Sequence, residues 1–426
     1  MASLKTYQLN ALLFLELASI TPLLIILGNV IPPFPLKLHH VGLGALFLVA
    51  LWSLLNDGYK RWLLYTGLGF TWVQFYQEGW YLKGLVDYFF GPFVLVVILD
   101  IIVNKRLPLR SLVKYENRFY ALLWVPAIIA VLQFFGWMPV TFWNATYVNY
   151  AYFGDLSIPR PNGLLYHGSE LSVIVTFLVL FQFFKKENKA LWGFIILLII
   201  AAMTYFKALF GCVALLIFYY LFFVNRGVLA RIRLIPARQM IAYGMVIGLV
   251  IFGFAVFYFK QVYAQTGYVF PRDMLTGRGA IWNIYLERIK EFSWYQYLFG
   301  NGMGTSFDIF ADYATPKTWW KLAEDPNTDL NYDAHNAVLS VFINSGLVGI
   351  AFFIFLFRMI WNQIKTWLPD AIWNKRVFWG VMLIPLITIG VTIPIYENAI
   401  FWLSLGFILI RWKRYTTLQD EQVENI

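Results

Sequence analysis

The feature that most limits how this chain can fold is a succession of long apolar runs separated by shorter polar connections. A helix needs about 20 consecutive apolar residues to cross a bilayer. The chain is 60% hydrophobic and only 13% charged, whereas a soluble domain spends about a quarter of its residues on charge. We therefore expect an all-α, polytopic membrane protein, with residues 1–426 forming a single integral-membrane domain. The runs predict about twelve transmembrane helices, at 9–31, 38–55, 62–77, 84–103, 118–140, 169–184, 190–205, 208–224, 240–259, 336–358, 377–395 and 398–411.

The basic residues predict which way these helices face. With the N-terminus inside, 22 of the 33 Lys and Arg residues fall in cytoplasmic segments, and seven of the other eleven fall in one loop at 260–334. Short loops therefore follow the positive-inside rule. This sidedness depends on splitting the apolar passage 190–224 into a hairpin at Thr204–Lys207, because a single helix there would reverse every later loop. The formal charge of +10 is then a topology signal that requires no nucleic-acid partner.

The single cysteine and the two ends of the chain add further limits. One cysteine, Cys212, excludes an internal disulfide. The stretch Met1–Gln8 is too short for a cleavable signal, and the apolar run after it is long enough to span a membrane. We expect both termini in the cytoplasm, with 412–426 as a polar cytoplasmic tail.

Two extracytoplasmic loops, 141–168 and 260–335, are predicted to be long and ordered. Loops of this length are usually functional or disordered, and both contain aromatic residues of the kind that disordered segments lack. The larger loop is expected to be partly helical. We predict one amphipathic helix over Gly277–Phe292 and short interfacial helices at 293–298 and 316–322. Any chemistry is expected in this larger loop.

His335 is the best candidate for acid–base chemistry, because it stands where the large loop meets the next apolar helix. A histidine with an unperturbed pKa near 6.5 can accept a proton at neutral pH. The alternative is a histidine that caps the helix or lies at the interface, which is the more common role of a lone histidine. The basic residues in the same loop favour the catalytic interpretation.

Four cations on the outer side could bind a diphosphate. Arg278 and Arg288 lie ten residues apart on the expected helix, while Arg160 ends the smaller loop and Lys207 lies in the hairpin. Arginine binds phosphate oxygens with two donors at once. Glu170 follows Arg160 closely enough in the sequence to belong to the same polar pocket.

Two of these cations have a second interpretation. Arg288 and Lys290 can pair with Glu287 and Glu291 as a solvated helix face. Lys207 lies in a very short connection between two apolar helices, and a cation there indicates function. Alternatively, its long side chain can reach the membrane–water interface by snorkelling.

Two further patterns are weaker signals. Gly300–Gly304 lacks the Lys-Ser/Thr pair of a phosphate-binding loop, so we expect a turn there, with backbone contacts to an anion as the alternative. Asp325–Asp329 begins like a calcium loop but has Leu330 and Asn336 where glycine and glutamate are needed. The sequence indicates no Ser-His-Asp triad, zinc site or nucleotide-sugar pocket.

Several motifs in the second half of the chain resemble those of the O-antigen ligase and polymerase superfamily. His335-Asn336, followed after nine residues by Gly346-Leu347-Val348-Gly349, resembles the signature of that superfamily. Thr276–Trp282 and then Leu298–Gly304 are similar to the Gly-Arg…Trp…Gly-x-Gly run that precedes its histidine.

Two earlier segments agree with this resemblance. Arg160-Pro161-Asn162-Gly163 resembles the arginine segment of the family's earlier outer loop. Thr204–Lys207 resembles a Thr-x-Ser-Arg hairpin, with Phe206 and Lys207 in place of serine and arginine. The match covers about residues 150–360, and the first 140 residues match only in hydropathy.

The resemblance implies a metal-independent, inverting glycosyltransferase of the GT-C class that uses no cofactor. It would move a glycan from undecaprenyl diphosphate to an acceptor hydroxyl at the outer face of the bacterial inner membrane. Cations would stabilise the charge of the leaving diphosphate, and the histidine would take the acceptor's proton or hold its hydroxyl in line. The expected site residues are His335 and Arg278 for catalysis, Arg160, Arg278, Arg288 and Lys207 for the diphosphate, and Asn336, Glu170 and Gly302 as supporting residues.

The acceptor distinguishes the functions that this resemblance allows. A polymerase uses a second lipid-linked repeat unit, and a ligase uses the lipid A core; we favour the polymerase, because more polysaccharide systems need one. The implied partners are an undecaprenyl-diphosphate-linked oligosaccharide and membrane lipid, with a chain-length regulator as a further candidate. A non-enzymatic flippase for lipid-linked oligosaccharides is the alternative from another class. A flippase needs charges deep in a central cavity and has no need of a long, structured outer loop.

Overall fold

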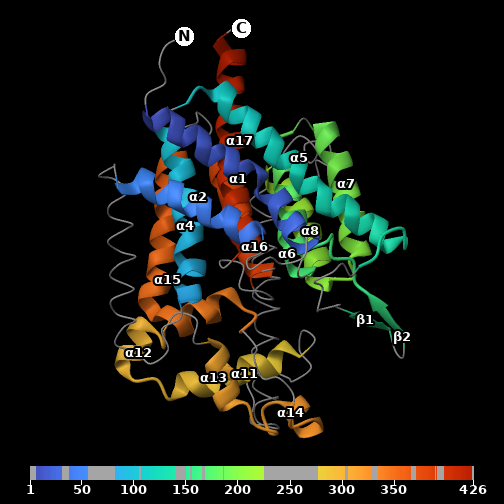
Figure 1. Cartoon of the computed structure of the whole chain (residues 1–426). Coiled ribbons are helices and arrows are strands. Elements are labelled where there is room, and N and C mark those ends of the chain that lie inside the picture. The colour runs from blue at the N-terminus through green and yellow to red at the C-terminus, as the bar shows by residue number, and fades with distance from the viewer. Residues whose placement is uncertain are drawn as a thin grey trace.

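The computed structural model describes residues 6–30, 38–55, 82–104, 107–140, 150–153, 156–165, 168–185, 187–224, 277–302, 306–327, 334–365, 371–388, 390 and 398–424. These residues form helices joined by turns, apart from one antiparallel two-stranded hairpin (Figure 1). The elements are α1 (Thr6–Val30), α2 (Leu38–Leu55), α4 (Leu82–Val103), α5 (Leu109–Phe134), β1 (Tyr150–Phe153), β2 (Leu156–Pro159), α6 (Gly168–Gln182), α7 (Glu187–Met203), α8 (Lys207–Tyr219), the π-helical turn η1 (Tyr220–Val224), α11 (Arg278–Lys290), α12 (Trp294–Phe299), α13 (Ser306–Tyr313), α14 (Trp320–Glu324), α15 (Ala337–Ile364), α16 (Ala371–Thr388) and α17 (Ala399–Glu424).

Several of these helices are long and apolar enough to cross a membrane. By length and composition, the four that qualify among the described residues are Gln8–Gly28, Leu109–Phe134, Lys207–Val224 and Ala337–Ile364. Shorter apolar helices accompany them at Gly91–Val103, Glu170–Gln182 and Lys189–Met203. The helical, membrane-type fold expected from the sequence is therefore confirmed. The total of about twelve spans stays a prediction, and the candidates at 62–77 and 240–259 lie outside the described residues.

The centre of the bundle is α17, the last helix of the chain (Figure 1). Every residue from Ile400 to Ile410 is buried, and a helix that is apolar on all sides belongs inside a bundle. It packs against α4, α5 and α6. Small residues allow the closest approach: a Cβ atom on Gly91 of α4 would lie 1.8 Å from the ring of Trp402, and one on Gly406 of α17 would lie 2.3 Å from Ile98.

Replacing Gly91 by alanine is expected to destabilise the bundle. Trp402 is only 1% exposed and its ring would lie 1.8 Å from the added methyl, so the substitution overpacks the α4–α17 contact at a cost of about 1–3 kcal/mol. The midpoint of thermal unfolding in detergent measures the loss. Gly211→Ala on α8 is the matched control, because a Cβ there meets no atom within 4 Å, and its midpoint should not fall. Equal midpoints for Gly91→Ala and the unsubstituted protein would contradict this packing.

A buried ion cluster joins α5 to α17. Glu116 on α5 is fully buried, and Arg411 and Arg414 on α17 lie 2.7 Å and 3.8 Å from its carboxylate oxygens. The guanidinium of Arg411 also lies 4.6 Å from the ring centroid of Tyr120. A buried carboxylate is tolerated when such partners surround it, so this cluster fixes which faces of the two helices meet.

The predicted hairpin in the 190–224 passage is confirmed as a break between two helices. α7 ends at Met203 and α8 begins at Lys207. Between them the hydroxyl of Thr204 donates to the carbonyl of Ala201 at 2.8 Å, and Tyr205 has a φ of +53°. That left-handed residue turns the chain back, so α7 and α8 pack side by side.

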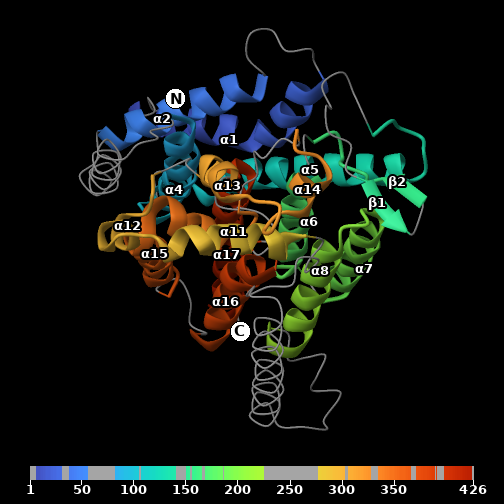
Figure 2. The same cartoon turned by 90° about the horizontal axis from the view of Figure 1, so that it is seen from below.

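A segment made of α11, α12, α13 and α14, called the outer segment because it lies outside the helical bundle, covers the end of the bundle opposite the C-terminal end of α17 (Figure 1). Seen from that side, α11 crosses the middle of the bundle and α12 lies over α15, with β1 and β2 at the edge (Figure 2). The outer segment has its own apolar core, separate from the main one, formed by residues such as Trp282, Tyr285, Phe310 and Trp319. It is therefore a folded unit and not an extended connection.

The structure also corrects several details of the sequence-based prediction. The helix expected over Gly277–Phe292 is present as α11, and that at 293–298 as α12, but the one expected at 316–322 begins only at Trp320. Neither α13 nor the hairpin β1–β2 was predicted, because short elements carry little periodic signal. The polar tail from 412 is a helical continuation of α17 to Glu424.

Candidate functional site

The first helix of the outer segment starts at a position that only glycine fits. Gly277 has a φ of +92°, and a Cβ there would lie 2.6 Å from the ring of Trp320. The left-handed backbone and the nearby ring together exclude any residue with a Cβ atom at position 277. Gly277 therefore fixes the start of α11, and Arg278 becomes its first residue.

Arg278 lies close to a second arginine from a distant part of the sequence. Arg278 is half-buried on α11, and Arg160 is half-buried just after β2. Burial, and then the positive charge of Arg160, lowers the pKa of Arg278 to about 10. Both groups are still charged at neutral pH. Two of the predicted diphosphate-binding cations are thus held within electrostatic reach of each other, where their repulsion favours a bound anion.

The residues after Arg160 anchor it to the end of α5. The side-chain oxygen of Gln133 accepts hydrogen bonds from the backbone N–H groups of Asn162 and Gly163, at 3.0 Å and 2.9 Å. Gly163 has a φ of +67°, and a Cβ there would lie 2.5 Å from the carbonyl oxygen of Pro126. These contacts anchor the segment that follows Arg160 to Gln133 of α5, a residue that no sequence pattern singled out.

His335 follows a residue that is tied to α11. The indole N–H of Trp282 donates to the backbone carbonyl of Ala334 at 3.1 Å. Trp282 lies one helical turn after Arg278, so both side chains leave the same face of α11. The structure thus places the His335 segment against the face of the helix that carries Arg278.

The residue after His335 also has a defined structural role. Asn336 caps α15, because its side-chain oxygen accepts from the N–H groups of Val338 and Leu339 at 3.0 Å each. His335 itself has a φ of +47°. A left-handed conformation costs a non-glycine residue about 1–3 kcal/mol, and such residues cluster at functional sites. His335 thus lies just before the cap of α15, in a left-handed conformation.

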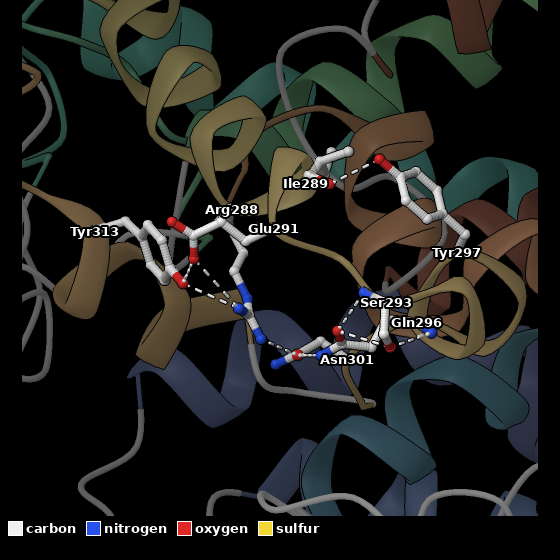
Figure 3. A network of polar contacts seen from close by, with 8 residues as sticks. All are labelled: Arg288, Ile289, Glu291, Ser293, Gln296, Tyr297, Asn301 and Tyr313. Atoms are coloured by element: carbon white, nitrogen blue, oxygen red, sulfur yellow. Dashed lines mark hydrogen bonds and ion pairs between the residues drawn. The ribbon is translucent and has the colours of Figure 1, made fainter.

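Arg288 lies at the centre of a polar network in the outer segment (Figure 3). Its guanidinium donates to the hydroxyl of Tyr313 and to the side-chain oxygen of Asn301, each at 2.9 Å. Glu291 lies 3.8 Å from the same guanidinium and accepts a hydrogen bond from Tyr313. This hydrogen bond raises the pKa of Tyr313, so the phenol stays protonated. This network matches the alternative interpretation of Arg288, in which its partners are protein side chains. The proposed diphosphate site therefore does not include Arg288.

The other cation on this face has a simple ion pair. Lys290 lies 2.7 Å from Glu287, and both side chains are about half exposed. Such surface pairs contribute little to stability. Replacing Lys290 should therefore have little effect, which makes it a suitable control position on the same helix as Arg278.

The Gly300–Gly302 turn packs directly against a break in α15. Gly346 interrupts that helix with a φ of +62° and a ψ of −157°. The N–H of Asn301 donates to the carbonyl of Ile343 at 2.6 Å, and the N–H of Gly302 to that of Asn344 at 3.3 Å. A break in a helix leaves backbone groups without their usual partners, and the turn supplies them here. This is the role the structure gives to Gly302.

Glycines on both sides make this contact possible. A Cβ on Gly300 would lie 2.3 Å from the backbone nitrogen of Ser345, and one on Gly346 would lie 2.4 Å from the carbonyl of Leu298. The two backbones therefore touch without intervening side chains. The spacing of these glycines was visible in the sequence, but the break was not, because the apolar pattern of α15 continues through it.

An apolar groove starts one residue from the Asn336 cap and follows α15. It has a cavity volume of about 150 Å³, lies between α15, α16 and α17, and is lined only by apolar side chains. Ala337 and Val338 form the end nearest His335, and Ile354 and Phe357 lie towards the other end. Ile354 is 63% exposed, so the groove is open at the side of the bundle.

Two further predicted site residues lie at the starts of helices. Lys207 is the exposed first residue of α8, and Glu170 is half-buried in the first turn of α6. Their roles stay predictions. No group of three or more His, Cys, Asp or Glu residues that could hold a metal occurs within the described ranges, and part of the acidic run, 328–333, lies outside them.

Comparison with known proteins leaves the family open. Neither the models of known protein families nor the curated protein sequences give a match to this chain. The resemblance to the O-antigen ligase and polymerase superfamily therefore depends on the sequence motifs alone.

Proposed function

We propose that this chain is a membrane glycosyltransferase that moves a glycan from undecaprenyl diphosphate to an acceptor hydroxyl at the outer face of the bacterial inner membrane. The observation that carries the proposal is the approach of Arg160 to Arg278, beside the segment of His335, at one end of an apolar helical bundle. Paired guanidinium groups suit a diphosphate, because each can bind two phosphate oxygens.

The proposed reaction needs one base and a stabilised leaving group. The acceptor oxygen attacks the anomeric carbon, the bond from that carbon to the diphosphate oxygen breaks, and its electron pair stays on the diphosphate. Arg160 and Arg278 stabilise the charge that grows there. His335 takes the proton of the acceptor hydroxyl. Attack from the side opposite the leaving group inverts the anomeric configuration.

The apolar groove is the proposed site for the part of the lipid tail next to the diphosphate. Its near end is adjacent to the His335 segment, its lining is wholly apolar, and it opens to the side of the bundle. The tail of a lipid-linked donor already lies in hydrocarbon, so an apolar groove attracts it by packing and not by removal from water. The groove would therefore orient the part of the tail next to the diphosphate without contacting the glycan.

Filling this groove is expected to weaken donor binding alone. Ile354→Trp puts a large ring at an exposed position in the lining of the groove, and the loss of packing between groove and tail should raise the donor KM severalfold. Ile195→Trp on α7, also at an exposed apolar position, is the control and should leave KM unchanged. Inhibition by inorganic pyrophosphate should be the same in both variants. Equal donor KM values in both variants would contradict a tail in this groove.

The acceptor is tested by giving the purified protein lipid-linked repeat units alone. A ladder of lengthening products supports the polymerase, which we favour. Transfer that starts only when lipid A core is added supports the ligase. Movement of intact lipid-linked oligosaccharide across vesicles, with no new glycosidic bond under either condition, would overturn the proposal in favour of a flippase.

A further inference from the structure

The break in α15 depends on the outer segment for its hydrogen bonds. The turn at Asn301 and Gly302 donates to the carbonyls of Ile343 and Asn344 just before Gly346. The part of α15 before the break begins directly after His335 and Asn336. The turn therefore holds the short helical piece that carries His335 at its start, while the longer piece after Gly346 continues through the bundle.

Arg288 holds that turn in place. One of its terminal nitrogens donates to the side-chain oxygen of Asn301, and the other donates to Tyr313 at the end of α13. Gln296, from α12, donates to the same oxygen of Asn301 at 2.8 Å. The guanidinium also lies 5.5 Å from the ring centroid of Phe292. Figure 3 shows Arg288 between Tyr313 and Asn301, with Gln296 also directed at Asn301.

We propose that Arg288 is a positioning residue: through Asn301 it fixes the turn against the break in α15 and so sets the position of His335. This role rests on the proposed function, because it assigns Arg288 to the same reaction without contact with the substrate. A reacting group displaced by about 1 Å can lose roughly 100-fold in rate. The rigidity of this contact thus matters to the reaction as well as to the fold.

The fork of the guanidinium is essential in this arrangement. Its two nitrogens bind different partners, Tyr313 and Asn301, at the same time, whereas the single ammonium of lysine cannot reproduce the planar fork. If Arg288 were instead a diphosphate ligand, lysine would keep the positive charge and therefore part of the donor affinity. Arg288→Lys therefore separates the two roles.

Hydrogen exchange tests the contact without relying on activity. In the full-length protein in detergent, Arg288→Ala and Arg288→Lys should each speed exchange at the amides of Asn301 and Gly302 at least tenfold. Exchange within the second part of α15, around Leu356, should not change. Tyr297→Phe is the matched control, because it removes a neighbouring hydrogen bond to the carbonyl of Ile289 and leaves Asn301 untouched.

Kinetics with a lipid-linked donor test the consequence. Arg288→Ala, Arg288→Lys and Asn301→Ala should each lower kcat by roughly 100-fold and leave the donor KM within twofold. Asn301→Asp keeps an acceptor oxygen for Arg288 and should restore most of kcat. Tyr297→Phe should behave as the unsubstituted protein.

Two results would overturn the positioning role. One is unchanged exchange at Asn301 and Gly302 in Arg288→Ala. The other is a donor KM that is raised in Arg288→Ala and restored in Arg288→Lys. That result would make Arg288 a diphosphate ligand. If the unsubstituted protein transfers no glycan to either acceptor, the proposed function fails, and the exchange comparison still decides whether Arg288 holds the turn.

Discussion

Replacing His335 by asparagine is expected to lower the rate of glycan transfer about 100- to 10,000-fold, the usual loss when a general base is removed. Asparagine is the sharper substitution, because it tolerates the left-handed backbone that His335 adopts with its φ of +47°, yet it cannot accept a proton. His335→Ala should show the same loss with an added decrease in stability. The rate of transfer per mole of folded protein, with folding checked by size-exclusion chromatography, is the measurement.

The pH profile adds an independent check on the same residue. A base that must be neutral loses activity as the pH falls through its pKa, which for an unperturbed histidine is near 6.5. The activity of the unsubstituted protein should therefore fall as the pH is lowered through this range. The residual activity of His335→Asn should not depend on pH in the same range. Full activity in His335→Asn would make His335 a structural residue at the start of α15.

Replacing Arg278 by alanine is expected to lower the transfer rate about 100- to 1,000-fold, which is typical of a lost donor to a developing negative charge. Arg160→Ala should have an effect of the same order. The double variant should lose less than the product of the two single losses, because both side chains serve one diphosphate. Inorganic pyrophosphate should compete with the donor in the unsubstituted protein and inhibit each variant more weakly.

Lys290→Ala provides the matched control for Arg278. It removes a cation from the same helix, but that cation is exposed and paired with Glu287, so transfer and pyrophosphate inhibition should not change. Arg278→Lys should retain part of the activity as a point charge without the bidentate fork. If Arg278→Ala and Lys290→Ala behave alike, the paired arginines do not bind the leaving group.

Local patterns were enough to place most of the helices. The run at 38–55 matches both bounds of α2, and the short polar interruption at Thr204–Lys207 correctly marked the turn between α7 and α8. Hydropathy reports directly on burial in an apolar surrounding, so these elements are visible without tertiary information. The start of α11 was also predictable, since a helix was expected from Gly277, although its residues from Gly279 to Tyr285 are buried on all sides and do not form a single apolar stripe.

Tertiary contacts explain what the sequence could not show. Arg288 looked equally suited to a phosphate and to its neighbours, and only the approach of Tyr313 and Asn301 decides its partners. Likewise, the apolar pattern of α15 continues through Gly346. The break there is stabilised by the Asn301–Gly302 turn, so the sequence around Gly346 does not reveal it. The grouping of Arg160 with Arg278 was a hypothesis, and the anchoring of Arg160 by Gln133 lies beyond any local pattern.

The central position of α17 has a consequence for biosynthesis. A chain leaves the ribosome from its N-terminus, and α17, which lies at the centre with Ile400 to Ile410 buried, follows every other described helix in the sequence. The earlier helices therefore cannot complete their packing until α17 has been made. A chain cut short before Ala399 would lack the helix against which α4, α5 and α6 pack.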